Sequence, residues 1–138
     1  MRSLQGTEEN SVYLPELDAE HRVMFRLLQE LRHAVVEGEA ASHLELKAQH
    51  LAAEANGHFR HEERLMREAR YPQVEWHKRQ HATARAQLAT LALAIRSGKQ
   101  ASIFQSLEAT AKEIRDHISV ADRMAGAYLR NHRLLTGL

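Results

Sequence analysis

Apolar residues recur at steps of three and four residues in four successive segments of the 138-residue chain. This spacing places them on one face of a helix, so the pattern predicts four amphipathic helices. We expect these helices over residues 19–37, about 42–70, 74–97 and about 102–131. Because the three connections are short, sequential helices should be antiparallel neighbours. The pattern therefore predicts a single all-α domain over residues 1–138, folded as an up-down-up-down antiparallel four-helix bundle.

Residues that start or stop helices mark the ends of these segments. We expect Asp18 to cap the first helix and Gly38 to end it. Tyr71-Pro72 should break the second helix, because proline cannot continue its hydrogen bonding. Residues 1–17 then form an N-terminal leader segment, of which we expect the first ten residues to be mobile.

The same spacing predicts which residues face the interior of the bundle and pack against other helices. In the first two helices they are His21, Met24, Phe25, Leu28, Leu31, Val35, Leu44, Leu51, Ala55, His58, Glu62 and Leu65. In the last two helices they are Val74, His77, His81, Ala84, Leu88, Leu91, Ile95, Leu107, Ile114, His117, Ala121, Met124 and Tyr128.

The composition narrows the class of protein. With only two prolines and no alternating segment rich in Val, Ile and Thr, strands are not expected. The absence of cysteine excludes disulfides, thiolate metal sites, iron–sulfur clusters and cysteine nucleophiles. Nineteen basic and eighteen acidic residues are interspersed, so we expect neither a nucleic-acid nor a membrane partner. No secretory signal and no apolar stretch of roughly 20 residues occurs, and we expect a cytoplasmic protein.

Polar residues that interrupt the apolar helix faces indicate which chemistry the protein can perform. The chain has ten histidines, and imidazole is the commonest metal-binding side chain. Burying an imidazole or a carboxylate without a partner costs on the order of a few kcal/mol, so such groups need one another or a metal. In an antiparallel bundle, the early parts of the first and third helices and the late parts of the second and fourth lie at one end. Seven residues occupy these parts: His21, His58, Glu62, His77, His81, His117 and Asp122.

The spacing within the helices supports convergence of these side chains, with one open question. The pairs on the second and third helices are each four residues apart, which places each pair on a single face. His117 and Asp122 are five residues apart, about 140° around an ideal helix. Both can reach one centre only if the bundle interior spans that arc or the helix widens locally.

The number and type of these side chains indicate more than one metal ion. Five imidazoles and two carboxylates are too many ligands for one ion, but they suit two first-row metal ions bridged by carboxylates. A ferritin-like di-iron site would be richer in carboxylates and would use Glu-x-x-His pairs, which the inward positions do not show. Each histidine taken alone is more simply interpreted as a hydrogen-bonded core residue. The seven together, on four helices at one end, are interpreted as a buried di-metal site.

The ordered set of motifs resembles the hemerythrin family, and the similarity covers about Val12 to Leu129. The motifs are Leu17-Asp18-Ala19-Glu20-His21, His58-Phe59-Arg60-His61-Glu62-Glu63, Tyr71-Pro72 followed by His77-x-x-x-His81, and His117-Ile118-x-x-x-Asp122. The resemblance implies a non-haem centre of two iron ions with an oxo or hydroxo bridge. His77, His81 and His117 would bind one iron, His21 and His58 would bind the other, and Glu62 and Asp122 would bridge both. The second iron would keep an open position, where dioxygen would bind.

The chain departs from the family pattern around that open position. Four residues before the inward histidines of the second and fourth helices the family often has Tyr and Trp, where this chain has Glu54 and Glu113. Each carboxylate either turns to the bundle surface or points inward, where it would contact a ligand imidazole, occupy the open position or relay protons. Ser119 stands where an apolar residue can close the pocket, and Ile114 is a further pocket candidate. Tyr13 stands where the family commonly has Gly.

Three functions are compatible with these features. The first is a dioxygen-binding protein for storage, delivery or sensing, with a signalling protein as partner in the last case. The second is an enzyme in which the two-iron centre reduces peroxide or oxygen, with Glu54 or Glu113 as general acid and a redox protein as partner. The third treats the metals as staples in a bundle that binds another protein. It ranks last, because structural metal sites usually have closed coordination and fewer ligands.

Overall fold

The computed structural model describes residues 11–137, which form helices and no strand. The elements are α1 (Pro15–Val36), α2 (Ala41–Glu68), α3 (Val74–Ser97), α4 (Gln100–His117), the π-helical turn η2 (Ile118–Asp122) and α5 (Arg123–Thr136). The all-helical prediction is confirmed for this part of the chain. None of the described helices is long and apolar enough to cross a membrane. The first ten residues, predicted to be mobile, lie outside the described range.

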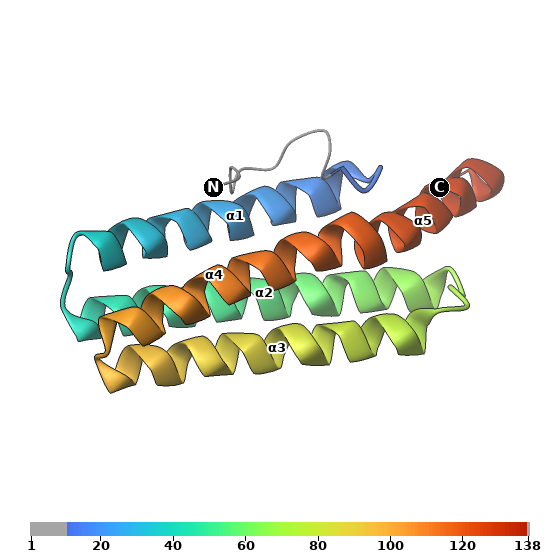
Figure 1. Ribbon diagram of the computed structural model, residues 1–138. Coiled ribbons are helices and arrows are strands. Elements are labelled where there is room, and N and C mark those ends of the chain that lie inside the picture. The colour runs from blue at the N-terminus through green and yellow to red at the C-terminus, as the bar shows by residue number, and fades with distance from the viewer. Residues whose placement is uncertain (1–10, 138) are drawn as a thin grey trace.

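The helices lie as neighbouring rods, with α4, η2 and α5 forming one continuous run (Figure 1). Helices that follow one another along the chain pack together, and α1 also contacts α4. The chain turns back at each of the connections after α1, α2 and α3 (Figure 1). As a result, the starts of α1 and α3 lie at the same end of the molecule as the end of α2 and the turn η2. The α5 helix extends past the start of α1 at this end (Figure 1).

The first helix begins at Pro15, four residues before the predicted start, so the prediction of Asp18 as its cap is wrong. Proline suits the first position of a helix, because its fixed φ is helical and its missing N–H would be unpaired there anyway. Asp18 instead accepts hydrogen bonds from the backbone N–H of Val12 at 2.8 Å and from the Ser11 hydroxyl at 3.0 Å. Part of the predicted leader is thereby tied to the first turn of α1.

The second helix ends at Glu68, two residues before the predicted boundary. Arg70 adopts a left-handed conformation with φ 55°, and the N–H of Tyr71 donates to the carbonyl oxygen of Met66 at 2.9 Å. This hydrogen bond is typical of a helix that ends in a left-handed residue. Pro72 contributes to the early stop, because proline disfavours helical geometry in the residue before it.

The core follows the predicted stripes along most of the chain. The inward-facing residues predicted for α1, α2 and α3 are buried, except Leu65 and Val74, which pack partly buried against the core. Ala121 is buried as predicted, but the prediction fails in α5: Met124 is 49% exposed and Tyr128 is only partly buried. Ala125 and Leu129, each one position further along the chain, are buried instead, together with Gly126.

The π-helical turn explains this shift of the inward face. The backbone N–H of Arg123 donates to the carbonyl oxygen of Ile118, five residues earlier, instead of four as in an α-helix. The turn η2 therefore contains one extra residue. Every residue after it is displaced by one position relative to a straight α-helix, so Ala125 takes the inward place predicted for Met124.

Candidate metal centre

Polar side chains from four helical segments meet at one end of the bundle. His21 comes from α1, His58 and Glu62 from α2, His77 and His81 from α3, His117 from α4 and Asp122 from η2. All are buried, and the most exposed of them, His117, has only 6% of its surface accessible. The four-residue spacing in α2 and in α3 places two side chains on the same helix face, one turn apart. The seven residues singled out from the sequence therefore share one space.

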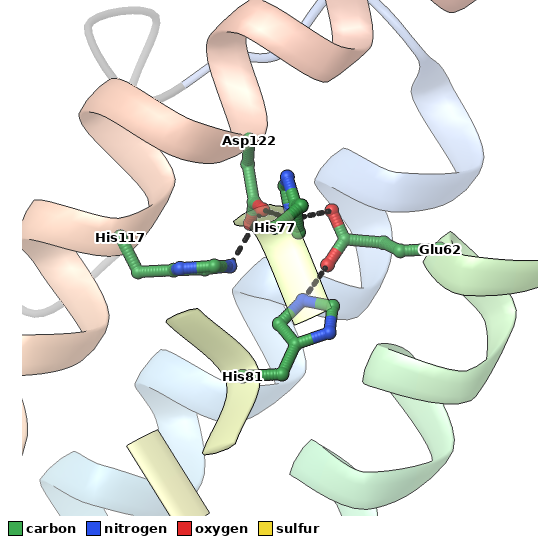
Figure 2. A group of neighbouring side chains, drawn as sticks. All are labelled: Glu62, His77, His81, His117 and Asp122. Carbon is green, nitrogen blue, oxygen red and sulfur yellow. Dashed lines mark hydrogen bonds and ion pairs between the residues drawn. The ribbon is translucent and has the colours of Figure 1, made fainter. Parts of the chain in front are cut away.

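Five of these residues form one group, shown in Figure 2. Each offers a nitrogen or oxygen atom, and these atoms lie within 4.8 Å of one another: the residues are Glu62, His77, His81, His117 and Asp122. The Nε2 atoms of His77 and His117 each lie 2.8 Å from Oδ1 of Asp122. The Nε2 atom of His81 lies 3.1 Å from Oε1 of Glu62. Three imidazoles thus face two carboxylates.

A second group consists of His21, His58, Glu62 and Asp122, whose offered atoms also lie within 4.8 Å of one another. The Nε2 atom of His21 lies 3.0 Å from Oδ2 of Asp122. The Nε2 atom of His58 lies 3.0 Å from Oε1 of Glu62. Both carboxylates belong to both groups, so they lie between a set of three imidazoles and a set of two.

Several buried atoms of this cluster lie at ion-pair distance from one another but form no hydrogen bond of normal geometry with any described residue. They include both carboxylate oxygens of Asp122, Oε2 of Glu62, and Nε2 of His77 and His117. Folded proteins satisfy nearly all buried polar groups, and leaving one unsatisfied costs about 1–3 kcal/mol. Imidazole nitrogens and carboxylate oxygens that converge in this way are the ligands that first-row metal ions bind. The cluster therefore fits a metal site.

Without a metal, the two carboxylates are held in the charged form, and they favour the charged form of His58 and His77. Burial opposes ionisation of Asp122, but the surrounding imidazoles, above all His117, hold its pKa well below the ordinary value. Burial and the charge of Asp122 also oppose ionisation of Glu62, yet His58 and His77 lower its pKa. Burial would lower the pKa of His77, but the two carboxylates raise it to about 9. Protons and metal cations thus compete for the same atoms.

Two further carboxylates, not predicted from the sequence, contact the outer ring nitrogens of His58 and His81. Glu20 lies with Oε1 2.6 Å from Nδ1 of His58 and with Oε2 2.7 Å from Nδ1 of His61. Glu63 lies with Oε2 2.7 Å from Nδ1 of His81. A hydrogen bond on the outer nitrogen fixes the tautomer and the orientation of an imidazole whose other nitrogen binds a metal. Both glutamates therefore belong to the site.

The sequence carried a weak signal for these two residues. Glu20 immediately precedes His21, and Glu63 immediately follows Glu62. Neighbouring residues on a helix point in directions about 100° apart, so adjacency does not imply that they share a site. Each glutamate in fact contacts a histidine on a different helix from its own. The packing of the helices had to be known before either could be assigned.

Glu54 and Glu113 occupy equivalent sequence positions, four residues before an inward histidine, but their environments differ. Glu54 is 47% exposed and lies 3.8 Å from the exposed His50, so of the two orientations left open by the sequence it takes the one at the bundle surface. Glu113 is half-buried and lines a pocket of about 240 Å³ together with His117. Of the two carboxylates, Glu113 alone can contact a molecule beside the cluster.

Ser119 and Ile114, also considered for the pocket, lie elsewhere. Ser119 is exposed, and its hydroxyl donates to the carbonyl oxygen of Asp116 at 3.3 Å. The buried apolar side chain of the turn is Ile118, because the π-helical geometry changes which residues face inward. Ile114 is buried in the hydrophobic core. Tyr13 adopts φ 68°, the left-handed conformation that glycine favours, which accounts for the family's preference at this position.

Fold and site together define an all-helical protein with a buried cluster of histidines and carboxylates suited to metal cations. The family model described as the hemerythrin HHE cation-binding domain matches residues 12–129. The chain therefore belongs to the hemerythrin family of HHE cation-binding domains, as its motifs predict. Comparisons with curated proteins and with solved structures gave no significant match.

Proposed function

We propose that the protein binds dioxygen reversibly at a pair of iron ions and serves oxygen storage, delivery or sensing. The observation that carries the proposal is the sharing of Glu62 and Asp122 between two groups of imidazoles. A carboxylate with an imidazole set on either side is placed to bridge two metal ions. One set has three imidazoles and the other has two, so the two ions would be unequal in protein ligands.

Each side chain has a defined role in this proposal. His77, His81 and His117 would hold one iron, His21 and His58 would hold the other, and Glu62 and Asp122, which lie between the two sets, would serve both. The irons would supply the electrons for binding dioxygen.

The protein around His21 and His81 excludes water, which favours reversible binding. Leu17 and Phe25 lie one turn before and one turn after His21 on α1, and neither has accessible surface. Phe59 stacks on His81 with the ring centroids 4.2 Å apart. A dry environment keeps protons from driving the oxidation of the irons. The proposal takes the helices as an up-down-up-down antiparallel bundle, which the reversals of the chain in Figure 1 support.

Metal analysis and a visible spectrum test this proposal. We expect about two irons per chain and, after mixing the reduced protein with air, an oxygenated spectrum that reverses on degassing. His58→Ala should lose metal and the spectrum. His50→Ala is the matched control, because this histidine is on the same helix but is 60% exposed and lies outside the cluster. One zinc per chain, or a spectrum unaffected by His58→Ala, would contradict the proposal.

The second candidate function is reduction of peroxide or oxygen, and the position of Glu113 favours it. A half-buried carboxylate beside His117 can act as a general acid close to the centre. Immediate conversion of the reduced protein to its oxidised form in air, without a reversible species, would support this alternative. Turnover then requires a redox protein as electron donor, whereas oxygen sensing requires a signalling partner.

A further inference from the structure

The pocket beside His117 lies between the start of α3 and the end of α4. Its volume is about 240 Å³. One water takes up roughly 30 Å³ in the liquid, so the pocket has room for several waters or one small molecule. The lining residues are Trp76, Gln80, Glu113, Asp116, His117, Val120 and Ala121.

His117 is the part of the cluster that this pocket reaches. Its Nε2 atom faces Asp122 at 2.8 Å, and its other ring nitrogen, Nδ1, is buried with no hydrogen bond from any described residue. The corresponding Nδ1 atoms of His58 and His81 are each held by a glutamate. His117 therefore lines the pocket, while its Nδ1 atom has no accessible surface and no described partner.

The polar groups of the pocket favour neutral molecules that hydrogen-bond. The Glu113 carboxylate accepts hydrogen bonds, and the Gln80 amide both donates and accepts them. None of the lining residues is Lys or Arg, and the second carboxylate, Asp116, pairs with the exposed Lys112 outside the lining. Carboxylates without a facing cation disfavour anions.

We propose that this pocket binds small neutral protic molecules, of the size of water and hydrogen peroxide, beside His117. Glu113 and Gln80 are their hydrogen-bond partners. The inference rests on the proposed metal centre but not on dioxygen as its ligand. It places a pocket next to His117, whereas His77, which has no accessible surface, does not line the pocket.

Solvent exchange of the histidine ring N–H groups tests this difference. The measurement uses the protein with the metal it holds when purified, labelled with nitrogen-15 in its histidines and followed by NMR. His77 is the internal control, because its Nδ1 atom is also buried without a described partner. We expect the ring N–H of His117 to exchange at least about tenfold faster than that of His77. Equal rates would overturn the proposal.

A pocket-filling variant makes the test specific. Glu113→Phe should slow exchange at His117 towards the rate at His77. Glu54→Phe is the control, because Glu54 lies four residues before His58 but is exposed. This change should leave the exchange rate at His117 unchanged. If Glu113→Phe leaves the exchange rate of the His117 ring N–H unchanged, solvent does not reach this group through the pocket, and the proposal is contradicted.

Fluorescence supplies a second measurement that does not depend on filling the pocket. Trp76 is the single tryptophan of the chain and lines the pocket, so its emission reports which molecules enter. Glu113→Gln should increase quenching by the anion iodide about twofold and leave quenching by neutral acrylamide unchanged, because it removes a negative charge and keeps a hydrogen-bonding side chain. Iodide quenching unchanged in Glu113→Gln would contradict the assigned selectivity. Loss of reversible oxygenation would leave both measurements intact, so the two proposals fail separately.

Discussion

The Nε2 atom of His117 lies 2.8 Å from Oδ1 of Asp122, although the two residues are five positions apart on one continuous helical run. In a straight α-helix they would be about 140° apart. The turn η2 brings both side chains to one face, because its hydrogen bond spans five residues. Such π-helical turns are frequent at functional sites. The register of this run therefore decides which residues reach the candidate metal centre.

The displaced face of α5 can be tested by two lysine substitutions. Met124→Lys should change the free energy of unfolding by no more than about 0.5 kcal/mol, because this side chain is exposed. Ala125→Lys should lower it by more than about 2 kcal/mol, because a long charged side chain would enter a packed core. Urea denaturation of both variants measures the difference. The opposite order would mean that the helix continues without the extra residue.

Glu20 should contribute to metal affinity although it would not touch the metal. Glu20→Gln weakens the hydrogen bond that orients His58, and we expect metal affinity to fall about 10- to 100-fold. Competition with a chelator of known affinity gives this ratio. Glu54→Gln is the control, since its side chain is exposed and lies outside the cluster. Equal affinities for Glu20→Gln and the control would remove Glu20 from the site.

The segment before α1 is held against α5 at a glycine. A Cβ atom on Gly126 would lie 1.9 Å from the carbonyl oxygen of Val12, so Gly126→Ala should displace this segment and lower the free energy of unfolding by more than about 1 kcal/mol. Gly57→Ala should instead raise it by about 0.5–1 kcal/mol, because alanine favours the helix and nothing lies within 4 Å of the new atom. Thermal denaturation compares the two variants. A neutral Gly126→Ala would contradict the close packing at Val12.

Metal affinity should increase with pH between 7 and 9. In the metal-free protein the contacts with Asp122 and Glu62 outweigh burial and raise the pKa of His77 to about 9, so this imidazole carries a proton at pH 7. A metal must displace that proton, and the competition weakens as the pH approaches the pKa of His77. We expect the proton on His77 to contribute a rise in affinity of up to about tenfold per pH unit, and this contribution to level off above pH 9. Chelator competition across this range measures the slope, and a flat profile would show that no proton is displaced.

Much of the architecture follows from local features of the chain. The helical period of apolar positions predicted α3 from Val74 to Ser97 and the buried faces of α1 and α2, because periodicity depends on neighbouring residues alone. The same period brought histidines and carboxylates onto inward faces. The ordered motifs identified the hemerythrin family, which the match to residues 12–129 confirms.

By itself, then, the sequence determined the helical class, the family and which side chains of α1, α2 and α3 turn towards the interior. Only the tertiary structure decided that Glu20 and Glu63 hold imidazoles of neighbouring helices, and that Glu113 lies at a pocket while Glu54 faces solvent. The physical reason is that periodicity orients a side chain relative to the axis of its own helix. Contacts between helices depend in addition on the relative rotation and height of the helices. The extra residue of η2 changes the rotation of the residues that follow it, and no distinctive residue type marks the position of this turn.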